Sequence, residues 1–181
     1  LIELLIAMVV ALVLLTGLSS IFISQRKAYD VQEQITEMQQ TARAAVDMIS
    51  RELKMAGYDP TRTLVRGTTV GVPHSTSQLR ILADLNSDGD TSDSHEDIIY
   101  TEDNENDQID RDTGGGGQPF AENIHSFSFS YFDEDGNTTT TSAEVRQIEI
   151  TIEAKTAEPD PNYTHPTYQD HYRRFTVTSR V

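Results

Sequence analysis

The chain opens with the stretch LIELLIAMVVALVLLTGLSSIFIS, residues 1–24, which decides the fold class. Every side chain from Leu4 to Leu15 is apolar, and no charge occurs between Glu3 and Arg26. About 22 uncharged residues in an α-helix extend over roughly 33 Å, which matches the hydrocarbon thickness of a bilayer. The stretch has neither the basic start nor the small-residue cleavage site of a signal peptide. We therefore expect a hydrophobic helix that spans the membrane and is retained in the mature protein.

Residues 25–57 continue the helix but change its character. Polar side chains now cover most of the surface, and one apolar stripe remains. Its members recur at three- and four-residue steps: Val31, Ile35, Met38, Ala42, Ala45, Ile49, Leu53 and Ala56. Gly57, followed by Asp59 and Pro60, is a typical helix end. The sequence predicts one helix of about 56 residues whose second half packs on another surface.

From residue 58 to residue 181 the hydrophobic period becomes that of β-strands. In residues 145–154, for example, Ile148, Ile150 and Ile152 alternate with polar side chains. The expected strands are 79–83, 97–101, 107–111, 124–132, 145–154 and 172–181. Such alternation predicts an antiparallel sheet with one buried face. Covering that face with the apolar stripe of residues 25–57 gives an α+β fold, a long helix packed on a β-rich head.

Composition excludes several classes of function. The 181 residues include 29 acidic and 14 basic side chains and no cysteine. Without cysteine there is no disulfide, no thiolate metal site and no cysteine nucleophile. The acidic balance argues against direct binding to nucleic acid, which needs clustered Lys and Arg. The histidines lack metal-ligand spacing and no Gly-x-Ser-x-Gly turn occurs, so we expect no catalytic residues and no enzymatic activity.

Glu3 is the one charged residue of the apolar stretch. An acid near the middle of a membrane helix costs about 2.5 to 3.5 kcal/mol. Glu3 can avoid this cost by reaching the lipid headgroups, since it lies near the helix start. Alternatively it pairs with a cation of a neighbouring chain, the nearest candidate being a terminal amino group. Pairing between subunits would fix the stagger of one chain against the next.

Two segments resemble a known family. Residues 1–12, LIELLIAMVVAL, resemble the start of type IV pilins and type II secretion pseudopilins. The chains of that family open Phe-Thr-Leu-Ile-Glu, and Leu1 corresponds to the third residue of this pattern. Residues 48–60, MISRELKMAGYDP, resemble PilW-type minor pilins and the related J-type pseudopilins. The resemblance implies a pilin fold and places Glu3 as the glutamate that neutralises the terminal amine of an adjacent subunit.

The same resemblance implies partners and a location. These are other pilin-like subunits in a homo- or hetero-oligomeric filament, the inner membrane before assembly, a prepilin peptidase with its assembly machinery, and a methylated terminal amine. Apolar packing through Leu1, Leu4 and Leu5 would provide affinity between subunits. Gly17 lies in a run of weak helix formers, residues 16–20. It is either a packing notch for a neighbouring helix or a point of local unwinding, and the resemblance favours unwinding.

The segment 84–97 predicts a metal site. Its oxygen-bearing residues alternate as in a calcium loop, with Gly89 allowing a sharp turn. The predicted ligands are Asp84, Asn86, Asp88, Asp90, Asp93 and Glu96. An EF-hand would place a bidentate glutamate at position twelve, which is His95 here. We therefore expect an isolated loop that binds Ca²⁺, the other interpretation being a solvated acidic turn.

The function that these patterns favour is structural. The chain would be a subunit of a type IV pilus or pseudopilus, held in the inner membrane by residues 1–24 and then packed by them into an extracellular filament at the cell surface. The alternative is a monomeric single-span membrane protein with a periplasmic calcium-binding or sensing head. The sequence leaves open which machine the subunit would serve and whether it would be a major or a minor component.

Overall fold

The computed structural model describes residues 2–181, so the predicted assembly residue Leu1 lies outside the described residues. One long helix, α1 (Ile2–Leu53), precedes all of the strands. The elements that follow are β1 (Gln78–Leu82), β2 (Asp97–Asp103), β3 (Gln108–Asp112), β4 (Gln118–Glu122), β5 (Ile124–Phe132), the 3₁₀ helix η1 (Ser142–Glu144), β6 (Gln147–Lys155) and β7 (Arg174–Arg180). The chain forms two compact units, residues 1–37 and residues 38–181. The α+β prediction is confirmed.

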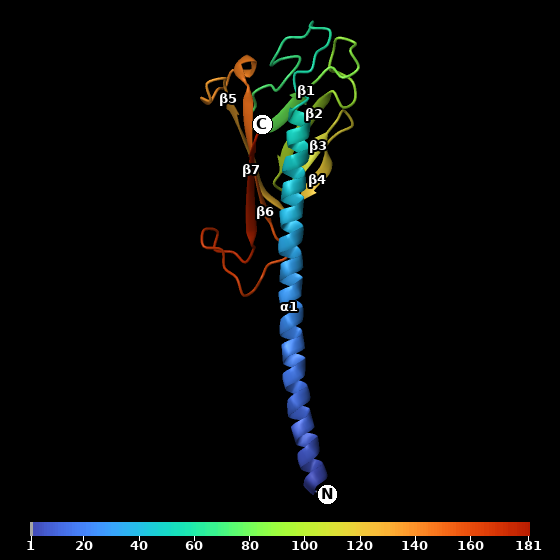
Figure 1. The fold of residues 1–181 in the computed structure, drawn as a ribbon, viewed down its shortest axis with the longest axis vertical. Coiled ribbons are helices and arrows are strands. Elements are labelled where there is room, and N and C mark those ends of the chain that lie inside the picture. Colours follow the sequence, from blue (N-terminus) through green and yellow to red (C-terminus); the bar gives the residue numbers. More distant parts are fainter. Residues whose placement is uncertain (1) are drawn as a thin grey trace. The chain divides into compact units, whose positions relative to one another are not determined.

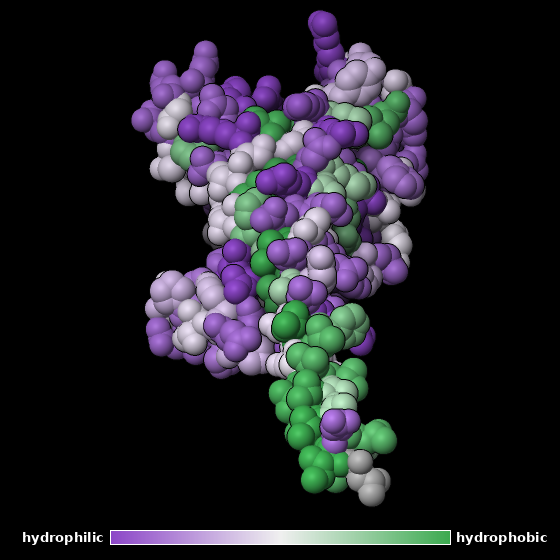
Figure 2. Space-filling view, turned by 60° about the horizontal axis from the view of Figure 1, so that its bottom comes forward, coloured by the Kyte–Doolittle hydropathy of each residue, from purple (hydrophilic) through white to green (hydrophobic). Residues whose placement is uncertain are grey.

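The first unit contains the first part of α1, whose side chains from Ile2 to Asp30 are all exposed. Its surface is hydrophobic over most of its length, shown in green in Figure 2. The helix is continuous at Gly17, and the Thr16 hydroxyl donates to the Leu12 carbonyl oxygen at 2.8 Å within it. The predicted unwinding is therefore not present in this structure. A Cβ atom added at Gly17 would meet no atom within 4 Å, so its surface stays open to a neighbour.

The second unit contains two antiparallel sheets (Figure 1). One has four strands in the order β1-β2-β3-β4, and the other has three in the order β5-β6-β7. The prediction of a single sheet is therefore wrong, because the strands divide into two. The division falls at Asn123, between β4 and β5, where a φ of 59° turns the chain out of its extended course. Next to this turn, Ile124 donates its backbone N–H to the Asp107 carbonyl oxygen at 2.7 Å. The Asn123 carbonyl oxygen accepts the backbone N–H of Lys155 in β6 at 2.8 Å.

The strand β4 was not predicted from the sequence. It contains Pro119, which has no N–H to donate to a neighbouring strand. The topology accommodates this residue because β4 is the last strand of its sheet, and a register shift between Ile109 and Asp110 lies opposite it. Proline is tolerated on edge strands and at bulges. All six predicted strands are present; the bounds of β5 are as predicted, and those of the other five differ by at most two residues.

The second part of α1 packs against both sheets of its unit. Its apolar stripe is buried from Met38 onwards; the buried apolar residues are Met38, Ala42, Ala45, Val46, Ile49 and Leu53. The Ser50 hydroxyl lies 3.3 Å from that of Ser179 in β7, and the Arg43 guanidinium lies over the Phe175 ring. These contacts confirm the predicted role of the stripe. The helix ends at Leu53, and turns carry the chain to Gly57, which has a φ of 83°.

A buried ion pair joins α1 to the four-stranded sheet. Glu52 is 7% exposed, and its Oε1 accepts from Arg111 Nη2 of β3 at 2.6 Å. The hydroxyl of Tyr100 in β2 donates to Glu52 Oε2, and Arg111 Nε lies 3.2 Å from the same hydroxyl. Burial, reinforced by the Glu52 carboxylate, raises the pKa of Tyr100. The sequence pattern missed this contact because Glu52 lies between apolar positions of the stripe and its partners are more than 45 residues away.

Replacing Glu52 with alanine should destabilise the head by about 3 kcal/mol, because Arg111 and the Tyr100 hydroxyl lose their buried acceptor. Urea unfolding of the full chain in detergent measures this change. Near-UV circular dichroism of the tyrosines follows it, because the chain contains no tryptophan. The matched control is Asp47→Ala, which removes another acid of α1 whose ion pair with Arg51 is exposed. That control should cost less than about 1 kcal/mol. If the two substitutions lowered the free energy of unfolding equally, the buried pair of Glu52 would contribute no more to stability than the exposed pair of Asp47.

Candidate functional site

The acidic loop joins β1 to β2 and is anchored at both ends by buried carboxylates. Asp84 is fully buried and Glu96 is 3% exposed, although both belong to a polar segment. The two ends lie together because Ala83 donates its backbone N–H to the Glu96 carbonyl oxygen at 3.0 Å. Asp84 also donates its backbone N–H to the Tyr58 carbonyl oxygen at 2.9 Å. The sequence pattern marked these residues as ligands but gave no sign that they are buried.

The Asp84 carboxylate shapes the first turn of the loop. Its Oδ1 accepts the backbone N–H of Ser87 at 2.6 Å, and its Oδ2 accepts that of Gly89 at 3.1 Å. Gly89 has a φ of 91°, which side chains other than glycine rarely tolerate. A Cβ atom at this position would also lie 3.4 Å from the Thr63 hydroxyl oxygen. The turn therefore depends on glycine, as the sequence pattern predicted.

The Glu96 carboxylate closes the loop from its other end. Its Oε1 accepts two backbone N–H groups, from Leu85 at 2.7 Å and from Asn86 at 2.9 Å. Its Oε2 is buried and has no hydrogen-bond partner in the part of the chain that the structure describes. A buried polar atom without a partner is costly and usually indicates a missing ligand or water. Glu96 is therefore the unsatisfied group of the loop.

Three of the six predicted ligands come together. Asp84, Asp88 and Glu96 each offer a carboxylate oxygen, and these oxygens lie within 4.8 Å of one another. Within residues 2–181, no salt bridge joins any of the three to a basic side chain. Three acids at this separation repel one another unless a cation or a proton lies between them.

The other three predicted ligands have protein partners. Asp90 Oδ1 accepts from both the backbone N–H and the hydroxyl of Ser92 at 2.8 Å, and the backbone N–H lowers the pKa of Asp90. Asp93 Oδ2 accepts from the Asn86 side-chain amide at 2.6 Å. Asn86 Oδ1 in turn accepts the backbone N–H of Asp88 at 2.8 Å. These side chains support the loop, whereas the three clustered carboxylates form its candidate metal centre.

The predicted assembly residues lie in the first unit. By length and composition α1 can cross a lipid bilayer. Leu4 and Leu5 are 74% and 64% exposed. Between residues 2 and 181, no salt bridge is formed by Glu3. Glu3 is thus an acid within an apolar, fully exposed helical surface.

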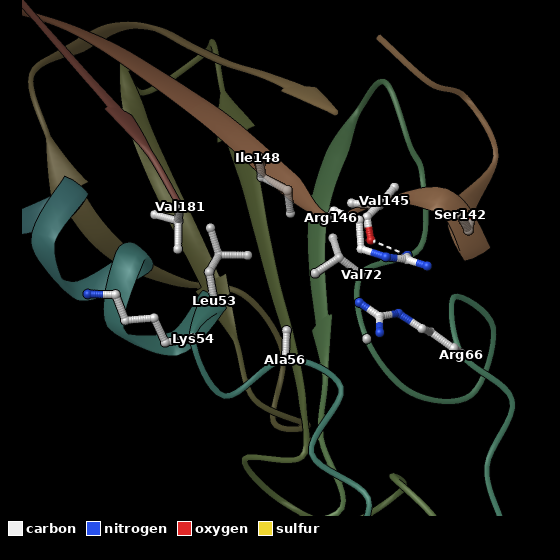
Figure 3. Close-up of a pocket in the computed structure, with 11 residues that line it drawn as sticks. Leu53, Lys54, Ala56, Arg66, Val72, Ser142, Val145, Arg146, Ile148 and Val181 are labelled. Carbon is white, nitrogen blue, oxygen red and sulfur yellow. Dashed lines mark hydrogen bonds between the residues drawn. The ribbon is translucent and has the colours of Figure 1, made fainter. Parts of the chain in front are cut away.

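A hollow of about 240 Å³ lies beside the C-terminal end of α1, lined by three basic side chains and no acidic one. Figure 3 shows Lys54 on one side of it, with Arg66 and Arg146 on the other. All three are exposed, and Arg146 already donates to the carbonyl oxygens of Ala143 and Val145 at 2.8 and 2.9 Å. With no buried polar group turned into it, this hollow is a groove in the surface, and we assign it no ligand.

Comparison with known proteins identifies no family for this chain. No protein-family model matches it. No curated protein matches it either. Among solved structures, a type IV-like pilin from Thermus thermophilus is similar, with 12% sequence identity and a TM-score of 0.44. The alignment covers 81% of this chain and 95% of that pilin.

Replacing Gly89 with alanine should destabilise the head by about 1 to 3 kcal/mol, because the turn requires a positive φ that alanine adopts only with strain. Chemical denaturation of the full chain in detergent measures the loss. Gly115→Ala is the matched control, since a Cβ there meets no atom within 4 Å and its φ is not positive. If both variants are as stable as the parent, the loop does not hold the turn described here.

Proposed function

We propose that this chain is a structural subunit of a type IV pilus or a pilus-like filament, assembled through the first part of helix α1. The observation that carries the proposal is the exposed surface of residues 2–24, which is predominantly apolar on all sides and contains one charged residue, Glu3. Burying apolar surface contributes about 25 cal/mol per Å². A helix that is hydrophobic all round therefore needs an apolar environment on every side.

Two environments meet this need in succession. In the inner membrane, lipid chains surround the helix, whose uncharged length matches the bilayer. In a filament, the equivalent helices of neighbouring subunits surround it. Lipid and packed helices are similarly apolar, so the transfer between them requires no exposure of the helix to water. Close packing is assisted by small residues, and Gly17 offers an open surface for it.

Glu3 would provide the register of this assembly. Its carboxylate has no cationic partner among the described side chains, and a charge within an apolar environment strongly favours pairing. The terminal amine of an adjacent subunit is the partner that the resemblance of residues 1–12 to pilins implies. An ion pair formed only at one relative stagger selects that stagger from the many that apolar packing alone would allow.

The remaining residues would form the filament surface. Helix residues 38–53 are built into the second unit, so the head is one folded body rather than a β-domain on a free linker. Of the pilin types, residues 48–60 favour a PilW-type minor subunit or a J-type pseudopilin. The competing possibility is a monomeric membrane anchor carrying the same head.

The substitution Glu3→Ala tests the proposal. The variant should remain in the inner membrane, because removing a charge favours insertion. Its amount in the sheared surface filaments should fall by at least about tenfold, which corresponds to the loss of roughly 1.4 kcal/mol of subunit pairing. Quantitative immunoblotting of the membrane and sheared fractions measures both amounts.

The control is Glu33→Ala, which removes an exposed acid from the polar part of the same helix. It should be incorporated as well as the parent. Cryo-electron microscopy of the sheared fraction then separates the two candidate functions. A helical array or a tip position occupied by this chain supports the filament subunit, whereas its complete absence from filaments supports the monomeric anchor.

A further inference from the structure

We propose that Asp84, Asp88 and Glu96 bind one Ca²⁺ ion, which fastens the acidic loop to the segment that follows helix α1. This proposal concerns the second unit alone and does not depend on filament assembly. It narrows the six ligands suggested by the sequence pattern to the three carboxylates that the fold brings together.

The first reason is the state of Glu96. Its side chain is almost completely buried, and Oε2 has no hydrogen-bond partner in residues 2–181. A carboxylate removed from water has to be compensated by a cation or by hydrogen bonds to both oxygens. The backbone of the loop satisfies Oε1 alone. The second oxygen therefore remains available as a ligand.

The second reason is the spacing of the three carboxylates. Oxygens bound to the same Ca²⁺ at 2.3–2.6 Å can be at most about 5 Å apart. The oxygens offered by Asp84, Asp88 and Glu96 lie within 4.8 Å of one another, so they satisfy this limit as the chain is folded. Asp84 and Glu96 are buried at fixed places beside the ends of β1 and β2. Asp88 is exposed, and its two oxygens accept from the Asp90 backbone N–H and the Asn86 side-chain amide, each at 3.1 Å.

The donor atoms select the kind of metal. Carboxylate oxygens favour hard cations over Zn²⁺ or copper ions. Ca²⁺ accepts six to eight oxygens in irregular arrangements, while Mg²⁺ requires a nearly regular octahedron. Backbone carbonyls and water would complete the coordination. The twelve acidic and one basic residues of positions 84–112 also raise the local concentration of cations.

Binding would have a consequence outside the loop. The backbone N–H of Asp84 donates to Tyr58 at 2.9 Å, and the Thr91 hydroxyl donates to the Thr69 carbonyl oxygen at 3.0 Å. Residues 57–69 thus lie against the loop but contain no regular helix or strand. A cation that draws Asp84, Asp88 and Glu96 together would stabilise this segment as well. Calcium would act here as a structural link in a head that has no disulfide.

The test uses the full chain in detergent micelles, stripped with a chelator and titrated with CaCl₂ or MgCl₂ by calorimetry. We expect one Ca²⁺ per chain and at least about tenfold weaker Mg²⁺ binding. Ca²⁺ at about one hundred times its dissociation constant should raise the melting temperature by roughly 10 °C. It should also slow amide hydrogen exchange in residues 57–69. Absence of saturable Ca²⁺ binding would overturn the proposal.

Variants identify the ligands. Glu96→Gln and Asp88→Asn should each weaken Ca²⁺ binding by at least about tenfold. Asp88→Asn alters an exposed side chain, so it remains informative if Glu96→Gln fails to fold. Asp135→Asn, in an exposed acidic turn elsewhere, and Asp90→Asn, within the loop but outside the cluster of three carboxylates, should change the affinity by less than about twofold. Unchanged binding in both Glu96→Gln and Asp88→Asn would refute this ligand set.

Discussion

The structure depends on a single helix whose two parts have opposite requirements. Residues 2–24 present mostly apolar side chains on all sides, and none of them is buried within this chain. Further along, the same helix narrows its apolar surface to a stripe that the two sheets of the head cover. The first part must obtain its apolar environment from lipid or from other chains, while the second obtains it from its own fold. The anchoring and the assembly proposed above both rest on this difference.

Buried charge is treated in two ways in the head. The Glu52 carboxylate is compensated within the fold. Its Oε1 accepts from the Arg111 guanidinium, and its Oε2 accepts from the Tyr100 hydroxyl. Asp84 and Glu96 are also buried, but within residues 2–181 their carboxylates accept only backbone N–H groups, and one oxygen of Glu96 accepts none. The first arrangement is complete within the chain. The second would be completed by the cation proposed above, and this contrast singles out the acidic loop among the many acidic turns of the surface.

Much of the architecture could be predicted because it rests on local periodicity. A three- and four-residue apolar repeat identified the buried face of α1, and two-residue alternation identified six of the seven strands in the described chain. The strand β4 was missed because Pro119 is unfavourable in most strand positions, and only the topology shows that it lies at an edge. The division into two sheets was missed because it falls at a single residue, Asn123, whose positive φ leaves no mark on the hydrophobic period.

By itself the sequence determined which surfaces are apolar, where the acids concentrate and where glycine permits a turn, since these properties belong to single residues and their spacing. Only the tertiary structure decided which acids are buried and which of them meet. Asp84 and Glu96 lie twelve positions apart and come together because β1 and β2 pair at their ends. Glu52 meets Arg111 because α1 packs across the sheet. Partners that are distant in sequence leave no periodic signal, so the compensation of a buried charge is visible only in the folded chain.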